Sequence, residues 1–312
     1  MSRHVTMGPG REFDAVRALL EQWGPAAVGI GDDGAVLDVP AGSRLVVSTD
    51  TTVEGVHFRE DWLAPEEVGW RAAMAALSDL AAMGSTPLGA LLALTVPDRW
   101  RGRLGELAKG LGEAAVKSRA PIVGGDVTVG DRLALAITVL GHAPHPLTRG
   151  GARPGDTLYV TGALGGPGAA LAAWELGRAP HSADRARFAR PEARITAGEW
   201  MAAHGAHAAI DLSDGLGGDA AHLAAASGVR CVVEFERIPL HGHVNVADAL
   251  ASGEEYELLV AAPVLDVDAF RAATGGLALT AIGRVEDGSG VQGVQHGKRV
   301  TVPGAHDHFA ST

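Results

Sequence analysis

Strand-like and helix-like segments alternate along this sequence, and the alternation restarts after a glycine- and proline-rich cluster at 149–155. Apolar residues three and four positions apart predict helices over 12–23, 66–83 and 101–117. Runs of β-branched and aliphatic residues predict strands over 44–50, 90–96, 133–140, 157–160, 208–212, 231–235, 257–261 and 279–285, and two strand-like pieces flank Gly124, Gly125 and Asp126. Alternation of this kind predicts a layered α/β or α+β fold.

The length and composition fit two globular domains. The chain has 312 residues, of which 46% are hydrophobic and 20% are charged, as in well-packed proteins. Because clusters of Gly and Pro are typical of linkers, we predict an N-terminal domain over 1–148 and a C-terminal α/β domain over 149–312.

The charge balance limits the possible partners. Lys and Arg number 26 against 37 Asp and Glu, so the net charge is −11, and such a field repels nucleic acid and anionic membrane surfaces. The three lysines, Lys109, Lys117 and Lys298, do not follow the glycine spacing of a phosphate-binding P-loop. A phosphate-bearing ligand would therefore need metal ions or arginine.

The single cysteine and the absence of targeting signals favour a reducing compartment. Cys231 excludes an internal disulfide framework, and its neighbours Val232 and Val233 predict a buried apolar residue rather than a reactive thiol. The first residues lack a basic stretch followed by an apolar segment, and no apolar run approaches membrane-spanning length. We expect a cytoplasmic protein.

Several aspartates stand where the local pattern favours neutral residues. They are Asp32, Asp33, Asp50, Asp79, Asp126, Asp211 and Asp214. The neighbours of Asp79 on its predicted helix are Ala75, Ala76, Ala82 and Met83, so its carboxylate projects from a small apolar face. A buried carboxylate without a partner costs several kcal/mol, roughly, and hard cations with oxygen ligands are natural partners. The pattern therefore predicts Mg²⁺.

Each of these aspartates also has an ordinary structural explanation. Asp at a strand end or before Gly is most often a helix cap or turn former, and Asp79 could instead pair with Arg71. The number of such positions in both halves favours the metal interpretation.

Glycine-rich segments invite two phosphate-binding interpretations. Gly29, Gly31 and Gly34 match the dinucleotide fingerprint, but 35–40 resembles a strand rather than a helix, and two carboxylates would lie in the turn. We therefore reject that match. The segment 162–168 before a predicted helix is either an anion cradle or, as we prefer, a tight strand-to-helix turn.

The paired histidines have a similar ambiguity. His241 with His243, and His306 with His308, could bind a metal. They lack cysteine partners or a His-Glu-x-x-His arrangement, so we interpret them as polar loop or tail residues.

Eight motifs, in order over most of the chain, resemble those of thiamine-monophosphate kinases, which belong to the aminoimidazole-ribotide synthetase superfamily. The motifs are Gly29-Ile-Gly-Asp-Asp33, Ser48-Thr-Asp-Thr51, Val53-Glu-Gly-Val-His-Phe58, Leu77-Ser-Asp-Leu-Ala-Ala-Met-Gly84, Val123-Gly-Gly-Asp126, Leu147-Thr-Arg-Gly-Gly-Ala152, Ile210-Asp-Leu-Ser-Asp-Gly215 and Gly253-Glu-Glu-Tyr-Glu257. The resemblance implies the two-domain fold of that superfamily. The N-terminal sheet domain would bind ATP and Mg²⁺ and form a homodimer, and the C-terminal domain would complete a site in the groove between the two.

The resemblance also implies the activity and the residues that carry it. The expected reaction converts thiamine monophosphate to thiamine diphosphate with ATP and several Mg²⁺ ions. The expected Mg²⁺ ligands are Asp33, Ser48, Thr49, Asp50, Asp79, Asp126, Asp211 and Asp214. The expected ATP contacts are Gly125, Asp126, Arg149 and Ser213, and the expected substrate contacts are His57 and Glu254. No general base is expected, because a phosphate monoester with a second pKa of about 6 is already mostly deprotonated at neutral pH.

Some positions depart from the family pattern. Gly34 replaces a usual Cys and Glu255 a usual Asp, and the tail near His306 lacks the family's stacking aromatic, so Phe58 and Phe309 are not assigned that role. The alternatives are another ATP-dependent synthetase of the superfamily or a non-catalytic nucleotide-binding regulator.

Overall fold

The computed structural model describes residue 4, residues 11–31 and residues 34–302. The described residues of 1–80 and 86–144 form one compact unit, and those of 81–85 and 145–302 form a second. Within the described part of the chain, no helix is long and apolar enough to span a bilayer.

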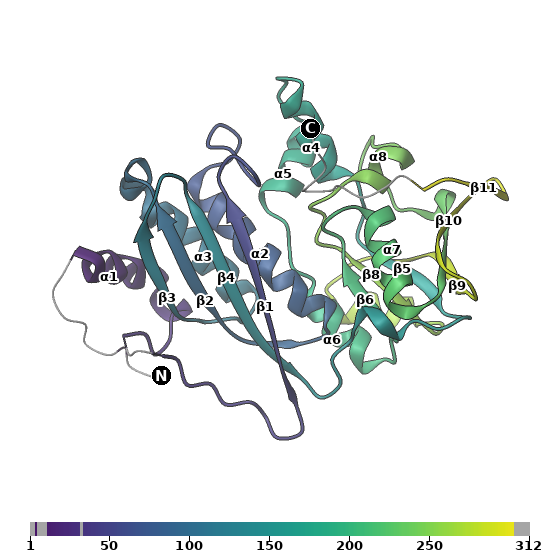
Figure 1. Ribbon diagram of the computed structural model, residues 1–312, viewed down its shortest axis with the longest axis horizontal. Coiled ribbons are helices and arrows are strands. Elements are labelled where there is room, and N and C mark those ends of the chain that lie inside the picture. The colour runs from purple at the N-terminus through teal and green to yellow at the C-terminus, as the bar shows by residue number, and fades with distance from the viewer. Residues whose placement is uncertain (1–3, 5–10, 32–33, 303–312) are drawn as a thin grey trace. The chain divides into compact units, whose positions relative to one another are not determined.

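The first unit is a four-stranded sheet with helices on one face (Figure 1). Its elements are α1 (Arg11–Trp23), η1 (Gly24–Ala26), β1 (Arg44–Val53), α2 (Pro65–Ala82), β2 (Thr86–Val96), η2 (Asp98–Arg103), α3 (Leu104–Lys117), β3 (Ile122–Val129) and β4 (Ala134–Ala143). The strand order is β1-β4-β2-β3, in which β4 is antiparallel to both neighbours and β2 and β3 are parallel.

Alternation along the strands decides which face the helices cover. Leu92 of β2 and Ile137 of β4 are buried, and together with Leu77 of α2 and Leu111 of α3 they line one small apolar space. Side chains on the opposite face, such as Val47, are half exposed. The sheet therefore has a helix-covered face and an open face.

Two glycines allow α2 and α3 to cross closely. A Cβ at Gly69 would lie 2.2 Å from the carbonyl oxygen of Leu107, and one at Gly110 would lie 1.8 Å from that of Glu66. Because no side chain fits at either position, the backbones approach more closely than alanines would permit. This contact fixes α2, which carries Asp79, against α3.

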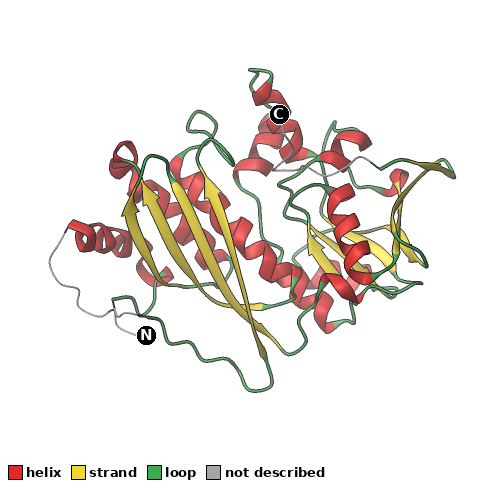
Figure 2. Cartoon of the chain, in the orientation of Figure 1, coloured by secondary structure: helices red, strands yellow, loops and turns green. Residues whose placement is uncertain are grey.

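The second unit is a seven-stranded, mostly antiparallel sheet flanked by helices (Figure 2). Its elements are η3 (Arg149–Gly151), β5 (Thr157–Thr161), α4 (Gly166–Glu175), α5 (Ser182–Ala189), α6 (Ile195–Ala203), β6 (Ala208–Asp211), α7 (Leu216–Ser227), β7 (Arg230–Glu234), η4 (Phe235–Arg237), α8 (Val246–Ala251), β8 (Leu258–Ala262), α9 (Val267–Ala273), β9 (Leu279–Glu286), β10 (Gly290–Gln295) and β11 (Lys298–Val300). The strand order is β11-β10-β7-β9-β5-β8-β6, with β10 and β7 parallel. Leu158, Ile210, Leu223 and Cys231 belong to its apolar core.

Two local sequence predictions were wrong. Residues 35–40 contain neither helix nor strand, and Val36 is 96% exposed, because this segment is not paired with a neighbouring strand. Gly124, Gly125 and Asp126 lie inside β3 rather than between two strands, since parallel pairing with β2 continues through them.

Candidate active site

One set of the predicted ligands meets on the helix-covered face of the first sheet. Ser48 lies on β1 with its side chain toward α2, and its hydroxyl donates a hydrogen bond to Asp79 Oδ2 at 2.5 Å. Asp50, two positions along β1, shares this face, and its Oδ1 accepts the amide of Thr51 at 2.7 Å. The contact between β1 and α2 therefore joins two motifs that are 31 residues apart.

A second set lies on the open face of the same sheet. Thr49 Oγ1 accepts a hydrogen bond from Thr138 Oγ1 at 3.1 Å across β1 and β4. The strand register places Asp126 directly beside Ala93, and side chains in register share a face. A cavity of about 630 Å³ on this face is lined by Gly125, Asp126 and Thr138, and by residues 30, 31, 34, 35 and 37. Asp33, another predicted ligand, lies outside the described residues.

Gly125 must be glycine where it stands. A Cβ at this position would lie 2.0 Å from the carbonyl oxygen of Leu92 on β2. The missing side chain keeps β3 paired with β2 and leaves the backbone of Gly125 accessible to the cavity that Asp126 lines.

The donor set suits a hard cation. The grouped side chains of the first unit supply hydroxyl and carboxylate oxygens, which Mg²⁺ prefers, and phosphate and water oxygens usually complete its coordination. Among the described residues, no three His, Cys, Asp or Glu side chains are grouped closely enough to hold an ion by themselves. These oxygens therefore fit Mg²⁺ whose coordination shell is shared with a phosphate ligand.

His57 is held in a defined orientation by the turn after β1. Its Nδ1 accepts the backbone amide of Val53 at 3.1 Å. A neutral ring that accepts at Nδ1 carries its proton on Nε2, so His57 presents a donor there.

Carboxylates also gather in the second unit, after β6. Asp211 ends this strand and is 5% exposed, and Asp214 follows in the turn closed by Gly215, which has φ of +107°. Asp219, on α7, accepts the backbone amides of Ser213 at 3.1 Å and Asp214 at 3.2 Å. Burial, followed by the charges of Asp211 and Asp214, raises the pKa of Asp219 to about 7. A bound cation would relieve this repulsion.

Sequence analysis missed Asp219, although the same signal that identified Asp79 was present. Leu216 lies three positions before it and Leu223 four positions after it on α7, and both are buried.

Backbone hydrogen bonds hold the segment that carries Glu254 against residues 212 and 213, which follow β6. Glu254 N donates to the Ser213 carbonyl at 2.7 Å, and Tyr256 N donates to the Leu212 carbonyl at 2.8 Å. Glu254 and Tyr256 have φ of +64° and +53°, values that are rare for residues with side chains and are found at constrained functional sites. The Tyr256 hydroxyl donates to Glu254 Oε2. Sequence analysis missed Tyr256 as well.

Glu257 anchors this segment in the interior. It is fully buried and accepts hydrogen bonds from Thr161 Oγ1 at 2.6 Å, Arg187 Nη2 at 2.9 Å and Arg194 Nη2 at 2.5 Å. Burial alone would raise the pKa of Glu257, but the charge and hydrogen bonds of Arg194, with the charge of Arg187, outweigh burial and lower it.

The glycine-rich segment 162–168 is occupied by the protein's own side chains. Gly165 N donates to Glu255 Oε1 at 2.5 Å, and Gly168 N donates to Ser252 Oγ at 3.0 Å. Because these amides already have hydrogen-bond acceptors, the segment is a tight strand-to-helix turn, which is the interpretation that the sequence favoured over an anion cradle.

The other predicted residues that the structure describes lie outside its α-helices and strands. Arg149 is the first residue of η3 and is exposed. Its backbone carbonyl accepts a hydrogen bond from the Ser227 hydroxyl at 2.7 Å. His241 and His243 both face buried Asp184, with Nε2 to carboxylate distances of 3.4 and 3.7 Å. His306, His308 and Phe309 lie outside the described residues.

Comparison with known proteins settles the family. The AIR synthase related protein N-terminal domain matches residues 31–143, and its C-terminal domain matches residues 153–295. Thiamine-monophosphate kinase from Escherichia coli strain K12 is 36% identical over 320 residues, covering 96% of this chain and 97% of the relative. This chain belongs to the thiamine-monophosphate kinase family. A Rhodopirellula baltica member is 34% identical and covers 88% of this chain and 89% of its own.

Solved structures of the thiamine-monophosphate kinase family share the fold. The enzyme from Stenotrophomonas maltophilia K279a has a TM-score of 0.80 at 34% identity, covering 96% of this chain and all of that one. AaThiL complexed with AMPPCP and TMP has a TM-score of 0.76 at 31% identity, covering 97% and 99%. The hydrogenase maturation protein HypE has a TM-score of 0.78 at 18% identity, a likeness of fold alone. The predicted two-domain fold of the superfamily is thereby confirmed.

Proposed function

We propose that this protein phosphorylates thiamine monophosphate to thiamine diphosphate with ATP. The observation that carries the proposal is the match of nearly the whole chain to thiamine-monophosphate kinases at 36% identity. A family structure at 31% identity holds AMPPCP together with TMP, which are the two kinds of ligand that this reaction requires.

We assign the site residues by the family motifs and the local geometry. Mg²⁺ would be held by Asp33, Ser48, Thr49, Asp50, Asp79, Asp126, Asp211 and Asp214. ATP would contact Gly125, Asp126, Arg149 and Ser213, and thiamine monophosphate would contact His57 and Glu254. The Ser48–Asp79 hydrogen bond, the cavity beside Gly125 and Asp126, and the buried Asp211 support these roles.

The principal barrier is electrostatic. The attacking oxygen belongs to a phosphate that is already deprotonated at neutral pH, so no side chain need remove a proton. Two unit charges about 4 Å apart repel by about 4 kcal/mol at an effective dielectric of 20. Bound Mg²⁺ would supply the positive charge that offsets this repulsion.

The chain's own residues would orient the reactants. Asp79, on α2, is held by the Ser48 hydroxyl, and Asp126 is held by the pairing of β3 with β2. His57 offers its Nε2 proton, and Arg149 adds a permanent positive charge at an exposed position. Fixed donors and charges of this kind favour in-line transfer, because they need little rearrangement during the reaction.

We also propose a homodimer formed through the N-terminal domain, 1–148, with the C-terminal domain, 149–312, completing the active site. The open face of the first sheet carries Leu45 and Val47, which are 51% and 53% exposed. Adjacent exposed apolar side chains favour burial against a second copy. A cytoplasmic location is the matching proposal, since the single Cys231 suits a reducing compartment.

A reactive thiol would favour a different synthetase of the superfamily. Cys231 is buried in β7, and burial raises the pKa of its thiol to about 12, so it is an inert core residue. It is the chain's single cysteine, so thiol chemistry is not the basis of its activity.

A coupled ADP-release assay over a panel of phosphorylated small molecules tests the proposal. ADP release should require both thiamine monophosphate and Mg²⁺, and thiamine diphosphate should accumulate in equal amount. Release with another acceptor would assign a different substrate, and ATP binding without turnover would identify a nucleotide-binding regulator.

A further inference from the structure

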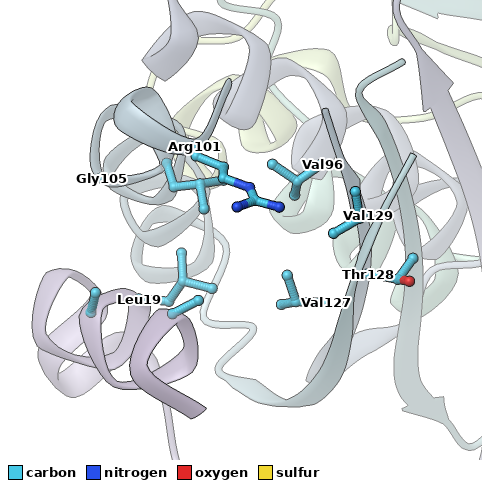
Figure 3. A pocket seen from close by; sticks show the side chains of 10 residues that line it. Leu19, Val96, Arg101, Gly105, Val127, Thr128 and Val129 are labelled. Atoms are coloured by element: carbon cyan, nitrogen blue, oxygen red, sulfur yellow. The ribbon is translucent and has the colours of Figure 1, made fainter. Parts of the chain in front are cut away.

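A second cavity, of about 610 Å³, lies on the helix-covered side of the first sheet. Figure 3 shows it between α1, the start of α3 and the ends of β2 and β3. Leu19, Val96, Leu104 and Val127 provide apolar walls from these four elements. Its volume is within the range of about 300–1,000 Å³ that is typical of small-molecule sites.

Among the described residues, Arg101 is the one charged residue that lines this cavity. Figure 3 shows its guanidinium turned into the space. Arg101 Nη2 lies 3.0 Å from Asp98 Oδ1, and the two side chains are 57% and 85% exposed. Because an exposed pair contributes little free energy, a ligand carboxylate can take the place of Asp98 on the guanidinium.

The cavity adjoins the one beside Asp126, because Val127 lines both and α1 contributes residues to both. Side chains along β3 alternate between faces, so Val129 points toward the helices, whereas Asp126 points to the open face. Arg101 lines this cavity alone, Gly125 and Asp126 line its neighbour, and Ser48 lies on β1 at the other edge of the sheet.

We propose that this cavity binds a small amphipathic carboxylate. The hydrocarbon part would lie among the leucine and valine walls, and the carboxylate would bind Arg101. The guanidinium would repel a thiazolium cation, and a polyphosphate would meet a single cation in otherwise apolar surroundings.

Octanoate is the probe, and octanamide is its uncharged counterpart. Each is titrated into protein with ¹³C-labelled Val and Leu methyl groups. We expect octanoate to shift the Val96, Val127 and Val129 methyl signals. Arg101→Gln should weaken octanoate binding about two- to fivefold without changing octanamide binding, and Asp98→Asn should strengthen octanoate binding by a similar factor.

A cavity-filling variant tests the location. A Cβ at Gly105, which lines the cavity, would meet nothing within 4 Å, so Gly105→Leu should fold and fill the space. It should weaken octanoate binding at least about tenfold. Gly102→Leu is the matched control, because its Cβ also meets nothing within 4 Å and Gly102 does not line the cavity. Equal octanoate affinity in wild type and Gly105→Leu would overturn the site, and equal affinity in Arg101→Gln would overturn carboxylate recognition.

Discussion

The Ser48 hydroxyl donates to Asp79 Oδ2 at 2.5 Å, so that the first strand of the sheet and the helix behind it share one polar contact in an apolar layer. Asp79 is flanked on α2 by buried Ala75, Ala76 and Ala82. A carboxylate in such surroundings is poorly solvated and depends on the groups that contact it. We assign bound Mg²⁺ as one of these groups.

Asp79→Asn is therefore expected to reduce kcat by about 100-fold or more at saturating Mg²⁺, because the amide keeps the shape but loses the charge. Steady-state ADP release measures the effect, and thermal unfolding should show a folded protein. Asp131→Asn, which changes an exposed carboxylate of the same unit, should leave turnover unchanged. Near-wild-type turnover of Asp79→Asn would remove Asp79 from the proposed metal ligands.

Asp79 also shows what a sequence can predict about such a site. Its small apolar neighbours at helical spacing identified an unusual carboxylate, and family motifs identified Ser48. Their hydrogen bond could not be foreseen, because it depends on the packing of α2 against β1. Local patterns show that a residue is unusual, whereas tertiary packing decides its partner.

The second unit shows the same difference between what local patterns predict and what tertiary packing decides. Five of its seven strands were predicted from aliphatic runs, and β10 and β11 were missed. The buried roles of Asp219 and Glu257 were also missed, because charged residues are rarely buried unless paired. Arg187 and Arg194, the partners of Glu257, are 70 and 63 residues away in the sequence. No local pattern indicates pairing over such separations.

Tyr256→Phe is expected to raise the KM for thiamine monophosphate about tenfold while changing kcat little. The variant removes the hydroxyl that donates to Glu254 Oε2, and a hydrogen bond to a charged group contributes about 1.5–3 kcal/mol. Steady-state kinetics with thiamine monophosphate as the varied substrate measure both constants.

Tyr159→Phe is the matched control for this effect. Tyr159 is also buried, and its hydroxyl accepts a hydrogen bond from the Leu265 amide at 3.1 Å. Tyr159 is distant from Glu254 in the sequence. Its loss should lower stability by about 1 kcal/mol without changing KM. The same rise in KM in both tyrosine variants would show that Tyr256 acts only through stability.

Glu255→Gln is expected to flatten the dependence of stability on pH. Burial raises the pKa of Glu255 to about 7, against the partly opposing hydrogen bonds of Ser252 and Gly165. Because the folded-state pKa exceeds the unfolded one, the protonated acid favours folding. This contribution is complete below about pH 4.5 and is lost as pH rises through about 7, for a total of up to about 3 kcal/mol.

Urea denaturation between pH 4.5 and 7.5 measures this dependence. The wild type should lose more stability with rising pH than Glu255→Gln, whereas Glu175→Gln, which changes an exposed residue of α4, should follow the wild type. Parallel curves for wild type and Glu255→Gln would show that Glu255 stays ionised throughout this range.

Arg194→Met is expected to destabilise the protein by about 3–5 kcal/mol, because it leaves the fully buried Glu257 without its bidentate partner. Arg178→Met, at an exposed position, is the control for losing a cation.

The pH dependence of this loss identifies its cause. The pKa of Glu257 is lowered in the folded protein, so the stability gained from its ionised form is present above the unfolded pKa of about 4.5 and is lost as pH falls through the folded value. The difference between wild type and Arg194→Met should therefore shrink in acid. Adding Glu257→Gln to Arg194→Met should recover part of the lost stability, because it removes the uncompensated charge. A loss that is constant with pH and is not recovered in the double variant would assign the effect of Arg194 to packing of its hydrocarbon stem.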